Sequence, residues 1–110
     1  MQLDEYQSLA ARTINQELDR QQILHHALFE MSGEMGEISS IYQKQLQGHE
    51  IDYSHLRKEI GDLLWGIAEL CTVNGFSMNE IARTNIEKLK ERYPDGFDPE
   101  RSKHRAEGDV

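Results

Sequence analysis

The sequence has almost no cysteine: Cys71 is the only one in 110 residues, and it lies in an apolar run. A single cysteine excludes a disulfide within the chain and a zinc site built on cysteines, and it suits a reducing compartment. The sequence also lacks an apolar run near the ~18 residues of a membrane span, and no basic-then-apolar leader opens it. We therefore expect a soluble cytoplasmic domain.

Basic residues are scarce as well. The chain has 12 Lys and Arg against 20 Asp and Glu, which gives a formal net charge of −8 at pH 7. This balance argues against nucleic acid as the main partner, because neutralising its phosphates takes clusters of Lys and Arg. An acidic protein can still bind a phosphorylated small molecule if divalent cations mediate the contact.

Alternating, strand-like patterns are absent, and the apolar spacing is helical throughout. The spacing predicts four helices, at about residues 3–18, 21–47, 52 or 54 to 74, and 77–93. Pro94 ends the last one, because proline disfavours helix before it and cannot continue it well. The connections are short, so consecutive helices are expected to be antiparallel neighbours.

The predicted fold class is all-α, an antiparallel bundle of about four helices in a single domain over residues 1–97. Apolar residues make up only 37% of the chain, which is low for a globular domain. The helices are therefore expected to bury their faces against a partner chain, so that oligomerisation completes the bundle. Residues 98–110 are polar and lack an apolar period, which predicts a mobile tail.

Two acidic pairs stand on or beside the apolar faces of the second and third helices: Glu34 with Glu37, and Glu59 with Asp62. Half-buried carboxylates without partners are costly, and in practice they take up a proton or find a cation. If both pairs faced each other, four carboxylates would surround one pocket suited to Mg²⁺ or Mn²⁺. The alternative is that these residues border an ordinary solvated face.

Polar residues interrupt the apolar face of the fourth helix too. Asn85 projects from the middle of that face, and Lys88 and Arg92 project from its edge. Lys44 lies two turns after Glu37 on the second helix. Lys and Arg beside a carboxylate-metal pocket are what a triphosphate needs. The alternative for Lys88 and Arg92 is ordinary snorkelling near a helix end.

The stretches "GEMGE", "KEIGDLLW" and "NIEKLKERYPDGF" together resemble the MazG-type all-α nucleoside triphosphate pyrophosphohydrolases. That family is marked by E-x-x-E, a spacer, and E-x-x-D. Here Glu34 and Glu37 form the first element, and Glu59 and Asp62 form the second. The resemblance covers roughly residues 20–97.

The resemblance implies hydrolysis of a (d)NTP between its α- and β-phosphates, giving the monophosphate and pyrophosphate. It implies that the two acidic pairs ligate Mg²⁺ and that one carboxylate, with Glu37 preferred, takes a proton from water. For the substrate it implies that Lys88 and Arg92 contact phosphates, that Asn85 contacts the nucleotide or its metal shell, and that Lys44 is a further phosphate contact. It also implies a homodimer or homotetramer.

Two other functions stay open from the sequence. One is a phosphoribosyl-ATP pyrophosphohydrolase, which the "RYPDGF" ending and Trp65 fit less well. The other is a non-catalytic helical interaction module, for which Asn85, Lys88 and Arg92 would have no purpose.

Glu30 and Glu69 are two further acids near the pairs, each either an outer neighbour of the ions or a solvated residue. The sequence does not identify which residues would contact the base of the nucleotide. Candidates are His25, His26, Phe29, Tyr42 and Trp65, but ordinary packing or exposure explains each of them at least as well.

Overall fold

The computed structural model describes residues 1–110 and contains five α-helices and no β-strand. The helices are α1 (Leu3–Ala11), α2 (Arg20–Leu46), α3 (Tyr53–Val73), α4 (Met78–Arg92) and α5 (Pro99–Lys103). The all-α fold class is confirmed, and α2, α3 and α4 fall where the apolar spacing predicts them. None of the helices has the length and apolar character needed to cross a membrane.

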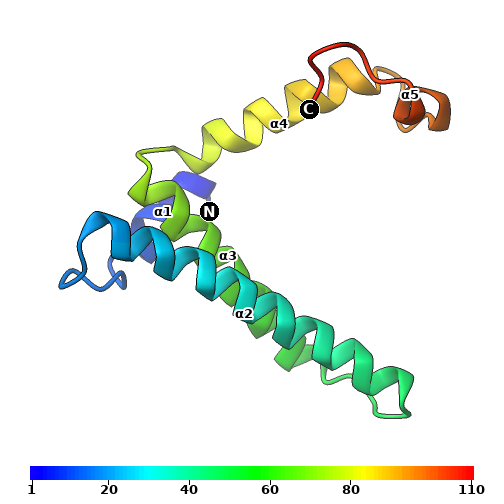
Figure 1. Cartoon of the computed structure of the whole chain (residues 1–110). Helices are drawn as coiled ribbons and strands as arrows, with labels where there is room; N and C mark the ends of the chain where they lie inside the picture. The colour runs from blue at the N-terminus through cyan, green and yellow to red at the C-terminus, as the bar shows by residue number, and fades with distance from the viewer.

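Helices α2 and α3 lie side by side as a long antiparallel hairpin (Figure 1). Asp19 begins α2 with a capping box, in which Asp19 accepts a hydrogen bond from the backbone of Gln22 and the Gln22 side chain accepts one from that of Asp19. Asp52 caps α3 in a similar way, accepting from the backbone amides of Ser54 and His55. Gly48 reverses the chain between them at a φ of 97°, which favours glycine.

The two hairpin helices approach closely at Gly66 of α3. A β-carbon at Gly66 would lie 2.7 Å from Cγ of Met31 on α2, so a larger residue would force Met31 to move. Gly33 and Gly36 of α2 have no atom within 4 Å of the point that a β-carbon would occupy. No helix of the chain packs there, and these two glycines face open space.

Helix α1 is shorter than predicted, because it ends at Ala11 rather than near Leu18. Beyond it, the Thr13 hydroxyl donates to the Ala10 carbonyl at 2.7 Å, and the Asn15 side chain accepts from the Glu17 amide at 3.0 Å. Such local bonds from Thr and Asn side chains compete with helix and favour turns. Ile14 is buried nonetheless. The apolar spacing therefore predicted the burial of Ile14 correctly, but its prediction that the helix continues to this residue is wrong.

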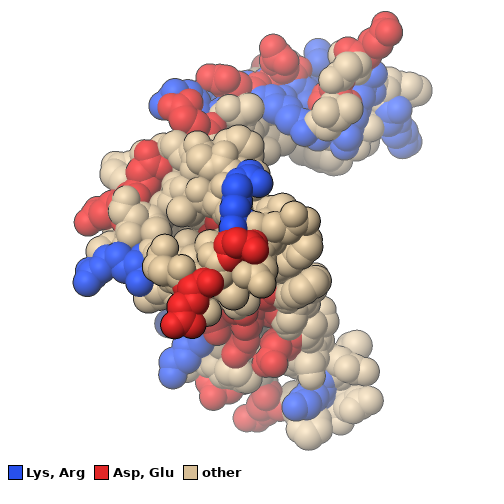
Figure 2. All heavy atoms as spheres, turned by 60° about the vertical axis from the view of Figure 1, so that its left-hand side comes forward, with Lys and Arg blue, Asp and Glu red and all other residues tan.

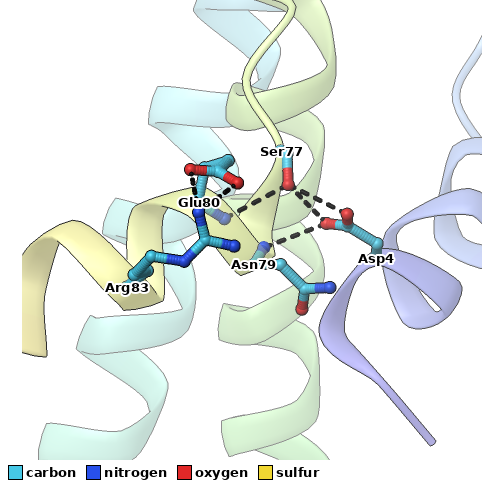
Figure 3. Close-up of polar contacts among 5 residues, drawn as sticks. All are labelled: Asp4, Ser77, Asn79, Glu80 and Arg83. Carbon is cyan, nitrogen blue, oxygen red and sulfur yellow. Dashed lines mark hydrogen bonds and ion pairs between the residues drawn. The ribbon is translucent and has the colours of Figure 1, made fainter.

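Helix α1 holds the start of α4 (Figure 3). The Asp4 carboxylate accepts from the Ser77 hydroxyl at 2.8 and 2.9 Å and from the Asn79 amide at 2.9 Å. The Gln7 side chain accepts from the Met78 amide at 2.8 Å. Two of the free amides at the N-terminus of α4 therefore find their acceptors on α1, which fixes the direction in which α4 leaves.

Helix α4 extends away from the α2–α3 hairpin after a turn at Gly75 (Figure 1). Its main packing partner is α1, so the expectation that α4 lies antiparallel on α3 is wrong for the single chain. The radius of gyration is 17.3 Å, against about 13 Å for a compact domain of this size. Only nine of 110 residues are buried. The chain is extended because α4 has an apolar face with no partner in its own chain, on which Ile81 and Ile86 are 47% and 51% exposed.

The C-terminal residues 98–110 include α5 and then return to α4. Asp98 caps α5, and Pro99 occupies its first turn. Asp109 then meets Arg92 of α4 in a paired contact of 2.6 and 2.9 Å, in which both side chains are largely buried. The mobility predicted for this tail concerns motion and stays a prediction.

The Asp4 contacts predict the effect of replacing Asp4 by alanine. The substitution removes the acceptor of the Asn79 amide, so hydrogen exchange of that amide should become about tenfold faster as the start of α4 loosens. Amide exchange followed by NMR measures this, with Glu5→Ala, an exposed neighbour on α1, as the matched control. Equal exchange at Asn79 in both variants would show that α1 does not hold α4.

Candidate metal centre and nucleotide site

The hairpin brings three of the four predicted metal ligands together. Carboxylate oxygens of Glu34 on α2 and of Glu59 and Asp62 on α3 all lie within 4.8 Å of one another. The E-x-x-D spacing puts Glu59 and Asp62 on one side of α3, and the antiparallel packing sets that side against Glu34. Glu37 belongs to a neighbouring group with His55 and Glu59, also within 4.8 Å. Glu59 is common to both groups.

Glu34 is the electrostatic centre of this arrangement. Its pKa is raised from 4.5 to about 7, first by a hydrogen bond with Glu59, then by desolvation and by the charges of Glu59, Asp62 and Glu30. A carboxyl group shares a proton with a second carboxylate when the two cannot both stay charged at short range. The Oε2 atom of Glu34 is also buried without a hydrogen-bond partner.

The donor set fits a divalent cation. It consists of carboxylate oxygens, which hard ions such as Mg²⁺ and Mn²⁺ prefer, and it includes a buried oxygen that lacks any other partner. A cation between Glu34, Glu59 and Asp62 would relieve the repulsion that raises the pKa of Glu34. The acidic residues of the hairpin can therefore hold a metal ion.

A groove of about 340 Å³ opens beside the carboxylates. Its lining residues come from α2 and the first turn of α3: Gly33, Gly36, Glu37, Ser40, Ile41, Lys44 and His55. Gly33 and Gly36 leave room in its floor because nothing occupies the space in front of them. Lys44 is thus the one predicted phosphate contact that shares a groove with a predicted metal ligand in the same chain.

The three predicted substrate residues of α4 lie elsewhere. Asn85 and Lys88 line a separate groove of about 570 Å³ along α4, near Phe76 and Thr84. Arg92 is paired with Asp109, and this contact raises the pKa of Arg92 and lowers that of Asp109. Because α4 extends away from the hairpin, one chain does not bring these residues to its own carboxylates (Figure 1).

Both signs of charge are present at the surface (Figure 2). A group of acidic side chains is visible on the lower part of the molecule, where the hairpin lies, and many Lys and Arg side chains, with acidic ones among them, lie at the upper end with α4 and α5. A polyphosphate with bound cations needs both kinds of surface.

Sequence reasoning missed the role of Glu69. Its side chain is fully buried, so it is not a solvated neighbour of the acidic pairs, and both its oxygens contact Nδ1 of His26, at 2.8 and 3.1 Å. The ring of Trp65 stands edge-on to His26, and its Nε1 donates to the Thr13 hydroxyl at 2.7 Å. His26 and Trp65 are thus engaged in packing. The sequence holds one indication of this role: no basic residue lies one turn from Glu69, so a charged partner for its carboxylate had to come from another helix.

The family model of the MazG nucleotide pyrophosphohydrolase domain matches residues 21–97. This chain belongs to that family. The matched range begins in α2 and includes both acidic pairs and the polar residues of α4, which supports the resemblance drawn from the sequence. Searches of curated proteins and of solved structures returned no match. The MazG family is a family of nucleotide pyrophosphohydrolases, and both acidic pairs lie within the residues that its model matches.

The raised pKa of Glu34 predicts how the stability of the metal-free protein varies with pH. Between about pH 4.5 and pH 7 the folded protein keeps a proton on Glu34 that the unfolded chain releases. The folded state binds more protons, so this contribution to the free energy of unfolding is fully present below about pH 4.5 and is lost as the pH rises through about 7.

Glu34→Gln should remove this pH dependence. Because Glu34 is only half-buried, solvent screening should reduce the contribution to about 1 kcal/mol. Urea unfolding in the presence of EDTA, compared at about pH 5 and about pH 8, measures the difference between wild type and Glu34→Gln, with Glu17→Gln as a control at an exposed acid. An identical pH dependence in all three proteins would contradict the assignment.

Proposed function

We propose that this protein is a Mg²⁺- or Mn²⁺-dependent pyrophosphohydrolase that cleaves a (d)NTP into the (d)NMP and pyrophosphate. The observation that carries this proposal is the cluster of Glu34, Glu59 and Asp62, with its unpartnered buried oxygen, in a chain of the MazG family. A cluster of this kind is costly in the absence of a cation, which is the physical reason to assign it to ion binding.

The roles of the carboxylates follow from their positions. Glu34, Glu37, Glu59 and Asp62 would hold the ions, and bound ions would supply charge neutralisation on the phosphates and activation of the attacking water. Glu37 is exposed at the edge of the groove, unlike the half-buried Glu34 and Glu59. It is therefore the carboxylate best placed to accept a proton from water that enters the groove.

We further propose that a second copy of the chain completes the site. The apolar faces of α4 and of the hairpin are both open, with Ile86 and Ile60 each 51% exposed. Packing α4 of one protomer on the hairpin of another would cover both faces. It would also bring Asn85 and Lys88 of one chain toward the carboxylates of its partner, in a homodimer or homotetramer.

The proposed activity is tested by incubating the purified protein with Mg²⁺ and a panel of NTPs, dNTPs and phosphoribosyl-ATP, followed by ³¹P NMR of the products. Monophosphate and pyrophosphate are expected from at least one nucleotide. Cleavage confined to phosphoribosyl-ATP would assign the protein to that activity instead. Absence of turnover for every compound, or release of orthophosphate alone, would overturn the proposal.

Substitution of the carboxylates separates catalysis from folding. Glu37→Ala and Asp62→Ala should each lower kcat/KM by about 100-fold or more while helicity and oligomeric state stay nearly unchanged, because both side chains are exposed. Glu87→Gln on α4, also exposed, is the control and should keep full activity. If the carboxylate variants unfold or dissociate, and the wild-type protein shows no metal-dependent activity, these acids are structural.

Asp109 occupies Nε and Nη2 of Arg92, so a phosphate that binds these two nitrogens has to displace the Asp109 carboxylate. Asp109→Asn weakens this competitor, so it should lower KM for the nucleotide several-fold and leave kcat close to that of wild type. Glu107→Gln, an exposed acid in the same segment, is the control for the loss of one negative charge. A raised KM in Asp109→Asn alone would show that Asp109 positions Arg92 rather than competing for it.

A further inference from the structure

His55 lies against the carboxylates although the two acidic pairs do not include it. Its Nε2 atom is 3.1 Å from Oε1 of Glu59. One ligand atom each from His55, Glu37 and Glu59 lies within 4.8 Å of the others. This group differs from the Glu34 group in its composition, because it contains a nitrogen donor.

The position of His55 is fixed by the start of α3. Its backbone amide donates to the Asp52 carboxylate at 3.2 Å, in the cap that begins the helix. Residues four apart share a helix face, so the imidazole reaches along α3 to Glu59. The His55 side chain is 51% exposed and lines the groove with Glu37, which leaves the imidazole open to an incoming ion.

We propose that His55, Glu37 and Glu59 form a second divalent-ion position, in which the imidazole nitrogen favours Mn²⁺ over Mg²⁺. The proposal rests on the binding of divalent ions by the carboxylates proposed above, and it does not depend on whether or which nucleotide is cleaved. Imidazole suits transition metals, whereas Mg²⁺ prefers ligands that are all oxygen. Glu59 belongs to both groups of ligands and has two oxygens, so one carboxylate can serve two neighbouring ions, as in other two-metal sites.

The competing explanation is that His55 and Glu59 are only a helix-stabilising pair. The chain contains a matched example, because His104 and Glu100 of the α5 region also stand four residues apart, with Nε2 and Oε2 3.7 Å apart. That pair is more exposed and has no third ligand beside it. His104→Ala is therefore the control that removes such a pair without touching the proposed site.

The test uses the full-length protein with Mn²⁺ alone and no nucleotide. Pulsed EPR of bound Mn²⁺ detects the ¹⁴N nucleus of a directly coordinated imidazole. The ¹⁴N signal is expected in wild type and in His104→Ala, and it should be absent in His55→Ala. A wild-type spectrum without ¹⁴N coupling, or a signal that persists in His55→Ala, would overturn the proposal.

Metal affinity gives a second readout. His55→Ala and His55→Gln should weaken Mn²⁺ binding about 10- to 100-fold at this position and change Mg²⁺ binding much less, so the preference for Mn²⁺ falls. Equal losses for both ions would overturn the proposed preference for Mn²⁺, and no loss for either ion would make His55 a structural residue. The His55→Gln variant guards against unfolding, because glutamine can still bond to Glu59. Nitrogen-coordinated Mn²⁺ in a protein that hydrolyses no nucleotide would refute the proposed function and leave this inference standing.

Discussion

The packing of α2 against α3 is the constraint on which the rest of the structure depends. The helices approach closely where Gly66 meets Met31, because a β-carbon at Gly66 would lie only 2.7 Å from Cγ of Met31. The register of the hairpin places Glu34 opposite Glu59 and Asp62, and it also buries Glu69 against His26. One helix pair thus carries a fully buried carboxylate, Glu69, whose oxygens both contact His26, and a half-buried one, Glu34, whose Oε2 has no hydrogen-bond partner.

The contrast between these acids separates structure from function. Glu69 has both oxygens engaged by His26, which is how a folded protein makes a buried carboxylate tolerable. Glu34 instead lies beside Glu59, which raises its pKa to about 7, and keeps one buried oxygen without a partner. Natural sequences retain such local conflicts mainly at functional sites. This difference, together with membership in the MazG family, is the basis for assigning the Glu34 cluster to metal binding.

Much of this arrangement was predictable from the sequence. The apolar period places α2, α3 and α4, and the E-x-x-E and E-x-x-D spacing predicts the acidic pairs on these helices, of which Glu34, Glu59 and Asp62 meet in the structure. The apolar period predicted too long a first helix, because side-chain hydrogen bonds of Thr13 and Asn15 form turns after Ala11. A short connection also did not make α4 pack on α3, because the bonds from Asp4 direct it elsewhere. The role of Glu69 depends on a residue 43 positions away, which local patterns do not report.

The central proposal is that the carboxylates of one chain act with Asn85 and Lys88 of another. The most direct measurement mixes two inactive variants, Glu59→Gln and Asn85→Ala, that carry different tags and are refolded together. If α4 acts on its partner's hairpin, each mixed dimer contains one intact site, and activity should return to about a quarter of the wild-type value, since random pairing makes half of the dimers mixed. Mixed dimers that form, as isolation on both tags would verify, but stay inactive would contradict the account.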